Sequence, residues 1–197
     1  MVIGETLPIF IMTSRCILQT TLLLYFSTMA LAMSNDLLRS QLSSSSLECQ
    51  ELLLQLNGTT EYCLKDRINF EIPEEIEKSR QFQKEDIILI THEMFQKIFD
   101  IFRRNISRTG WNETTVENLL VKLHWQKEHL EIILEDVKEK ENFTWDNRTL
   151  LHLKKYYLRI VQYLKAKEYS ICAWTIVQAE ICRNFFFLNI LTDYLQN

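Results

Sequence analysis

The chain has very little glycine and proline: three glycines and two prolines among 197 residues. All-β domains use these residues at the many turns between their strands, so their scarcity argues against a β-sandwich or barrel and favours an all-α domain. A strong charge of one sign is also lacking, because 26 acidic residues oppose 22 basic ones and the net charge is −4. Nucleic-acid-binding domains usually carry a basic face, so we expect no nucleic-acid partner.

The common catalytic and metal-binding motifs are missing as well. The sequence contains no glycine-rich phosphate loop, no nucleophile elbow and no Cys-x-x-Cys pair. His124 and His129 lie five residues apart, which turns them away from a common helical face, whereas a shared metal would require His-x-x-x-His. We therefore predict that the protein is not an enzyme and that it needs no metal or other cofactor.

The first 32 residues have the composition of a secretory signal peptide. Arg15 precedes a short apolar run that ends in the small-x-small sequence Ala30-Leu31-Ala32. A charged flank, a short apolar core and this ending are typical of a cleaved signal rather than a membrane span. No later segment approaches the ~20 apolar residues that a span requires. We expect cleavage after Ala32 and a secreted single domain over residues 33–197, with no membrane insertion.

Apolar residues recur at intervals of three and four in five stretches, which is the spacing of amphipathic helices. The stretches cover residues 35–55, 80–103, 112–140, 149–167 and 170–191. The connection over residues 57–80 is long, with Gly58 and Pro73 interrupting any regular element, and it lets the first two long helices run parallel. We predict an all-α, up-up-down-down cytokine bundle of five helices with a long first crossover loop. Four serines, residues 43–46, predict a bend or fraying in the first helix.

Four cysteines remain after the predicted signal: Cys49, Cys63, Cys172 and Cys182. They allow three pairings. A bond between Cys63 and Cys172 would hold the long connection against the last helix, and closing so long a loop would contribute roughly 3–5 kcal/mol. Cys49 and Cys182 lie within apolar helical patterns, where they are either buried free thiols or a second disulfide.

Five Asn-x-Ser/Thr sequons are consistent with export. They begin at Asn57, Asn105, Asn112, Asn142 and Asn147. All but Asn57 lie in predicted connections or at helix starts, where an attached glycan would reach solvent, and we expect N-glycosylation at these positions.

Several segments together resemble the type I interferons. Residues 63–67 and 172–174, which contain the two cysteines of the long-loop pairing, are similar to that family's loop and last-helix signatures, and residues 110–114 and 163–169 are also similar. The similarity extends over essentially the whole mature chain. It implies a secreted, monomeric helical cytokine that binds and bridges the two chains of the type I interferon receptor. Such binding triggers JAK-STAT signalling with antiviral, antiproliferative and immunomodulatory output.

The resemblance also implies roles for individual residues. The family's disulfide falls on Cys63 and Cys172, Cys49 takes the place of its free cysteine, and Asn112 takes the place of its familiar glycan. The high-affinity receptor chain meets the long loop and the last helix. The implied contacts are Leu64, Arg67, Ala179, Cys182 and Arg183.

The low-affinity receptor chain is implied to meet the opposite side, formed by the second, third and fourth helices. Lys154 is the best single candidate there.

Two departures from the family pattern fall on the expected high-affinity face. Gln178 stands where members often carry a basic residue, and Cys182 replaces a larger apolar one.

The alternative interpretation is another secreted helical-bundle protein, either a different cytokine or a carrier of lipid or small ligands. A carrier would need a cavity lined by apolar side chains. The dense apolar stripes of the predicted helices indicate a filled core instead.

Overall fold

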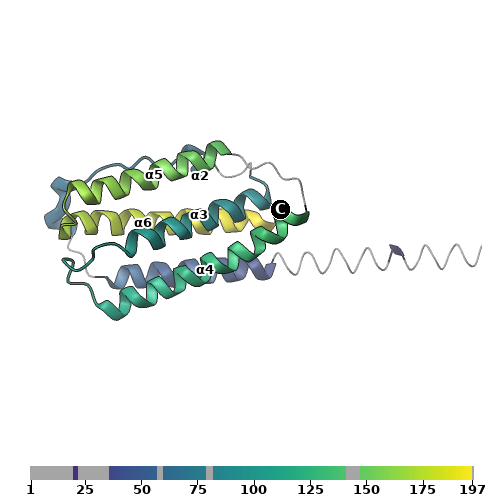
Figure 1. Cartoon of the computed structure of the whole chain (residues 1–197), viewed down its shortest axis with the longest axis horizontal. Helices are drawn as coiled ribbons and strands as arrows, with labels where there is room; N and C mark the ends of the chain where they lie inside the picture. The colour runs from purple at the N-terminus through teal and green to yellow at the C-terminus, as the bar shows by residue number, and fades with distance from the viewer. Residues whose placement is uncertain (1–19, 22–35, 57–59, 79–81, 141–146, 197) are drawn as a thin grey trace, which may run out of the picture.

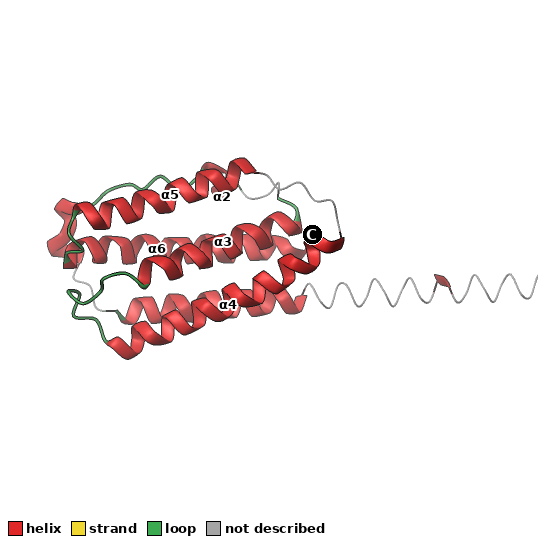
Figure 2. Ribbon diagram, viewed as in Figure 1, coloured by secondary structure: helices red, strands yellow, loops and turns green. Residues whose placement is uncertain are grey.

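The computed structural model describes residues 20–21, 36–56, 60–78, 82–140 and 147–196, and these ranges contain helices and loops but no strand (Figure 2). Residues 36–55 form the first long helix, followed by the 3-10 helix η1 (Thr60–Asp66), α2 (Glu74–Glu77), α3 (Lys84–Phe102), α4 (Glu113–Lys140), α5 (Asn147–Ala166), α6 (Ile171–Asp193) and the 3-10 helix η3 (Tyr194–Gln196). The prediction of an all-α protein with five long helices is confirmed. The predicted signal peptide, apart from Thr20 and Thr21, and its predicted cleavage site lie outside the described residues.

The long helices lie along one another in a bundle, as Figure 1 shows. The first helix and α3 run in the same direction, and the segment between them passes along the length of the bundle beside α5. Each later helix then reverses the direction of the one before it. The first helix, α3, α4 and α6 thus run up, up, down and down, as the long crossover predicts, and α5 runs parallel to the first two.

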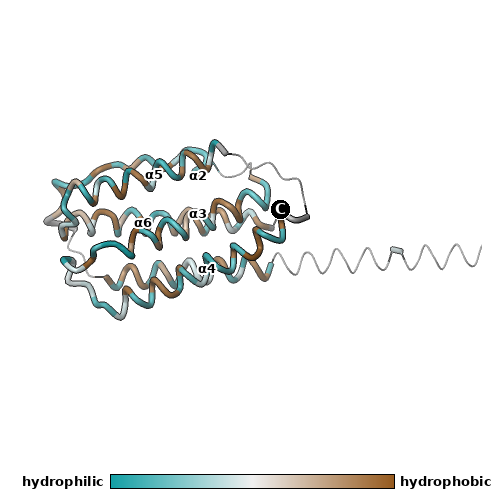
Figure 3. Tube along the Cα trace, viewed as in Figure 1, coloured by the Kyte–Doolittle hydropathy of each residue, from teal (hydrophilic) through white to brown (hydrophobic). Residues whose placement is uncertain are grey.

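A single core forms where the apolar faces of the helices meet. Polar and apolar residues alternate along each helix in Figure 3, and the apolar ones supply the buried side chains. The bulkiest fully buried side chains include Phe95, Phe102, Tyr156, Tyr157, Trp174 and Phe185. Burying each large apolar side chain contributes about 1.5–3 kcal/mol, so the filled core is the main source of stability.

The helix α6 is more apolar than we expected of any segment after the signal. By length and composition alone it could cross a membrane, with a mean hydropathy of 1.2 over its most apolar window. Half of that window is buried inside the bundle. The helix packs against α3, α5 and η1, so its apolar composition follows from its central position among them.

The four serines do not interrupt the first helix, which is continuous over residues 36–55, so the predicted fraying is wrong. Ser46 is buried, and its hydroxyl donates to the carbonyl oxygen of Phe185 on α6 at 3.3 Å. Ser45 Oγ accepts a hydrogen bond from Gln126 Nε2 on α4. Serine disfavours helix interiors because its hydroxyl competes for nearby backbone groups. Here neighbouring helices satisfy these hydroxyls, which removes the competition.

The long connection is more regular than predicted, because it contains η1 and α2. Pro73 occupies the N-cap position of α2 with φ −57°. A proline is tolerated at a helix start, where its missing N–H has no intrahelical acceptor to lose. Pro73 therefore begins a short helix rather than only interrupting regular structure. Gly58 lies outside the described residues.

Candidate functional site

A disulfide joins the long connection to the start of α6. Cys63 in η1 is bonded to Cys172, with the Cα atoms 5.1 Å apart and a sequence separation of 109. Cys49 and Cys182 are free, so the second-disulfide interpretation does not hold in the structure. Burial raises the pKa of the Cys49 thiol to about 12 and that of Cys182 to about 11, so both thiols stay protonated at neutral pH.

Side chains of α5 hold the same connection from a second direction. Arg159 donates through Nε and Nη2 to the carbonyl oxygen of Phe70, at 3.0 and 2.8 Å, and through Nη2 to that of Glu71 at 2.7 Å. Tyr163 donates its hydroxyl to the carbonyl oxygen of Asp66 at 2.9 Å. Hydrogen bonds from a guanidinium to backbone carbonyls are among the stronger ones. Residues 66–71 are therefore fixed against α5 as well as α6.

Between this anchored loop and α6 lies an open groove of about 570 Å³. The loop lines it with Leu64, Arg67, Ile68, Asn69 and Phe70, and α6 lines it with Ile176, Ala179, Glu180 and Arg183. The groove brings together four of the five residues that the resemblance assigns to the high-affinity receptor chain. The fifth, Cys182, does not line the groove; it is half-buried and packs against the core.

The groove combines exposed apolar surface with two cations. Leu64 is 64% exposed although it is a large aliphatic residue, and Ile68 beside it is also exposed. Arg67 is exposed as well. On the α6 wall, Arg183 Nη2 lies 3.1 Å from Glu180 Oε1, and its guanidinium lies 5.9 Å from the centroid of the Phe187 ring. An apolar anchor beside arginines is the composition found at the energetic centres of protein interfaces.

Gln178 is not on this face, so the expectation that it contributes to the receptor surface is wrong. Its side chain is buried, with 8% of the residue exposed. Its Nε2 donates to the carbonyl oxygens of Leu53 and Leu56, both at 2.6 Å. These carbonyls lie at the C-terminal end of the first helix, where intrahelical donors run out; that of Leu53 also accepts from the backbone N–H of Leu56 at 3.1 Å. The neutral Gln178 amide thus caps the first helix from α6.

Lys154 lies at a second and separate groove, of about 300 Å³, between α3 and α5. Its side chain is 53% exposed, and its Nζ lies 3.9 Å from Glu93 Oε2. Two cations that were not singled out from the sequence line the same groove: Lys97 from α3 and Arg104 from the turn just after that helix ends. Because Arg104 lies beyond the end of α3, helical spacing alone would not have identified the pair.

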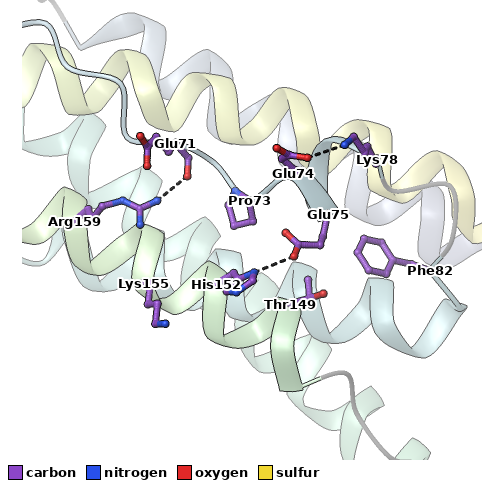
Figure 4. A pocket seen from close by; sticks show the side chains of 10 residues that line it. All are labelled: Glu71, Pro73, Glu74, Glu75, Lys78, Phe82, Thr149, His152, Lys155 and Arg159. Atoms are coloured by element: carbon purple, nitrogen blue, oxygen red, sulfur yellow. Dashed lines mark hydrogen bonds and ion pairs between the residues drawn. The ribbon is translucent and has the colours of Figure 1, made fainter.

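A third hollow, of about 610 Å³, lies between α2 and α5 (Figure 4). His152 Nδ1 on α5 lies 2.9 Å from Glu75 Oε1 on α2, and Lys78 pairs with Glu74 at 2.7 Å. A hydrogen bond from its own backbone N–H, followed by the contact with His152, lowers the pKa of Glu75. The contact of Glu75 with His152 and the Arg159 hydrogen bonds attach the connection to α5, while Lys155 on the same wall is exposed.

Two of the predicted glycosylation sites can be placed on the surface. Asn105 and Asn112 are both exposed. Asn112 Oδ1 accepts a hydrogen bond from the backbone N–H of Thr115 at 3.0 Å, which caps the start of α4 and leaves Nδ2 free for a glycan. Asn147 begins α5, whereas Asn57 and Asn142 lie outside the described residues.

Within the described part of the chain, no group of three His, Cys, Asp or Glu side chains is placed to hold a metal ion.

A family model for the interferon alpha/beta domain matches residues 38–195, which is most of the chain. The chain belongs to the type I interferon family. This interferon is 73% identical over 186 residues to interferon beta of Felis catus, and 60% identical over 187 residues to interferon beta of Homo sapiens. Each alignment covers 94% of this chain and 100% of the relative. The family resemblance inferred from the sequence is thus confirmed.

Solved structures agree with the fold of this interferon. Zebrafish interferon 1 superposes with a TM-score of 0.64 at 17% identity, covering 77% of this chain and 94% of that one. As a member of its family, this interferon is a secreted cytokine that acts through cell-surface interferon receptors, and it is not an enzyme. The carrier interpretation is excluded by the same membership.

Proposed function

We propose that this interferon bridges the two chains of the type I interferon receptor, using one groove for each chain, and so triggers JAK-STAT signalling with antiviral, antiproliferative and immunomodulatory output. The observation that carries the proposal is the groove between the disulfide-anchored loop and α6, lined by Leu64, Arg67 and Arg183. The protein performs no chemistry in this account. It acts by holding two receptor chains close enough for their cytoplasmic partners to react.

The groove between loop and α6 is proposed to bind the high-affinity chain. Burying an exposed leucine such as Leu64 contributes about 1.5–3 kcal/mol, and the disulfide and the Arg159 bonds hold the loop in place before the receptor arrives. A binding surface that is already ordered loses less entropy on association. We assign Ala179 a contact on the α6 wall and Cys182 a peripheral one, because Cys182 is half-buried and does not line the groove.

The groove between α3 and α5 is proposed to bind the low-affinity chain. Lys97, Arg104 and Lys154 line it together with exposed Leu158, while Glu93 and Asp100 offset part of the positive charge. Lys154 is exposed and the other two cations are half-buried, and charges at such a rim favour encounter and register more than tight binding. The weaker of the two contacts is thus assigned to this groove.

Maturation completes the proposal. We propose removal of residues 1–32 and a monomeric active form over residues 33–197. N-glycans are proposed at the five sequons, with Asn112 foremost because its amide nitrogen is free of the helix cap. The disulfide requires an oxidising compartment, which a secreted protein passes through.

Binding to soluble receptor chains tests this assignment. Arg67→Ala should weaken binding to the high-affinity chain by roughly tenfold and leave the other chain unaffected. Lys154→Ala should show the reverse pattern with a smaller effect. The matched controls are Lys65→Ala and Lys155→Ala, which remove exposed neighbouring cations outside the two grooves. Unchanged binding of Arg67→Ala to both chains would refute the loop assignment.

A further inference from the structure

A buried hydrogen-bonded network joins α5 to α6 directly behind the Leu64–Arg183 groove. Asn184 Nδ2 donates to the hydroxyl oxygen of Tyr156 at 2.6 Å and to the carbonyl oxygen of Glu180 at 2.9 Å. Asn184 Oδ1 accepts from the hydroxyl of Tyr157 at 2.6 Å. The Tyr156 hydroxyl in turn donates to Glu180 Oε1 at 2.6 Å. Four polar side chains in an otherwise apolar core are thus bonded to one another.

Glu180 carries this network to the surface. Asn184 and Tyr156 have no exposed area, whereas the Glu180 side chain is 11% exposed and lines the groove. Its Oε1 accepts from both Tyr156 and Arg183. A carboxylate that is almost buried needs such partners, because removing one leaves part of its charge uncompensated. The position of Glu180 is therefore set from the core by Tyr156.

The orientation of Arg183 depends on the same carboxylate. An arginine side chain carries about 2 kcal/mol of rotamer entropy when it is free. Here a hydrogen bond to Glu180 and the face of Phe187 restrain it, while its buried Nε has no hydrogen-bond partner. Burial and the neighbouring Tyr157 and Glu180 raise the pKa of Tyr156 well above its usual value, so its hydroxyl remains a donor throughout the physiological pH range.

We propose that Tyr156 and Asn184 are positioning residues for receptor binding: they hold the Glu180 carboxylate, which holds Arg183 in its binding orientation. The inference rests on the proposed function of the groove. Both residues are fully buried, so they act on the receptor only through Glu180 and Arg183. A side chain fixed before binding loses less entropy when the complex forms. Removing the restraint on Arg183 should therefore change mainly the rate at which the receptor chain dissociates.

A double-mutant cycle tests this coupling. Tyr156→Phe, Arg183→Ala and the combined variant of the full-length, secreted protein are compared for dissociation from the soluble high-affinity receptor chain. Tyr156→Phe should accelerate dissociation by roughly threefold to tenfold when Arg183 is present, and by less than about twofold when it is absent. A purely structural role would not make the effect of Tyr156 depend on Arg183.

The control removes a buried hydroxyl from elsewhere on α6. Thr192 Oγ1 donates to the carbonyl oxygen of Asn189 at 2.9 Å and lies outside the groove, so Thr192→Val should leave the dissociation rate unchanged. Glu180→Gln serves as a second variant should Tyr156→Phe fail to be secreted. It keeps the shape of the side chain but weakens its bond to Arg183, so it should show the same dependence on Arg183.

The outcomes separate the two proposals. If Arg183→Ala weakens binding but Tyr156→Phe and Glu180→Gln do not, or if their effects are equal with and without Arg183, the positioning role is wrong and the groove stands. If Arg183→Ala binds like the parent, the groove assignment fails, and the positioning role fails with it.

Discussion

Replacing Gln178 by alanine should destabilise the fold without touching the receptor surface. The Gln178 amide donates two hydrogen bonds of 2.6 Å to the carbonyls that end the first helix, and both Leu53 and Leu56 are buried. Each lost hydrogen bond costs about 0.5–1.5 kcal/mol. The further penalty of about 1–3 kcal/mol for a buried carbonyl without a partner applies to Leu56 alone, because the Leu53 carbonyl keeps its bond from the Leu56 N–H. Partial access of water to the vacated space reduces the sum, so we expect a loss of roughly 2–4 kcal/mol.

Thermal unfolding followed by circular dichroism measures this loss. For a domain of this size, each kcal/mol lost from the free energy of unfolding lowers the melting midpoint by about 2–4 °C, so the midpoint should fall by roughly 5–15 °C. Gln162→Ala, which removes an exposed glutamine from α5, is the matched control and should change the midpoint little. Receptor dissociation measured well below the midpoint should match the parent. A midpoint like that of the control, or faster receptor dissociation from the folded variant, would refute the capping role.

Three further predictions concern the disulfide, the free thiols and acid. Replacing both Cys63 and Cys172 by serine should lower the free energy of unfolding by roughly 4–5 kcal/mol in a denaturant titration, since their sequence separation is 109; a loss below about 1 kcal/mol would contradict the anchoring role. Cys49 and Cys182, with pKa values raised to about 12 and about 11, should resist iodoacetamide at pH 7 until the protein unfolds, and rapid labelling of the native protein would show that they are not buried as described. The pKa of Glu75 is lowered in the folded protein, so its stabilising contribution is present above the unfolded pKa of 4.5 and is lost as the pH falls through the folded pKa. Glu75→Gln should therefore reduce the fall in melting temperature below pH 4.5. An acid profile of melting temperature like that of the parent would contradict this.

The helices were predictable because the core imposes a helical spacing on the sequence. The expected stretches begin and end within a few residues of the observed helices, and the scarcity of glycine and proline already favoured an all-α fold. Contacts between distant residues were not predictable in the same way. In the serine-rich part of the first helix, Ser45 and Ser46 bond to α4 and α6, and these contacts could not be predicted from the local sequence.

In the candidate site, too, some features could be predicted from the sequence and contacts between distant residues could not. Residues 63–67 and 172–174 carry a family resemblance that named Leu64, Arg67, Ala179 and Arg183, and the structure places these four around one groove. The resemblance misjudged Gln178, because a position in a sequence does not reveal which side of α6 faces the first helix. The Tyr156–Asn184 network escaped notice for a related reason. Tyr156 and Asn184 are 28 residues apart in sequence, and nothing in the sequence around them indicates that they bond to each other when α5 and α6 pack together.

The central claim is that two separate grooves bind two receptor chains at once. Light scattering coupled to size-exclusion chromatography measures it directly, using the secreted protein with both soluble receptor chains in excess. We predict a complex with one copy of each component. Arg67→Ala combined with Arg183→Ala should lose the high-affinity chain and retain the other. Mutually exclusive binding of the two chains, with no ternary complex at saturating concentrations, would contradict the account.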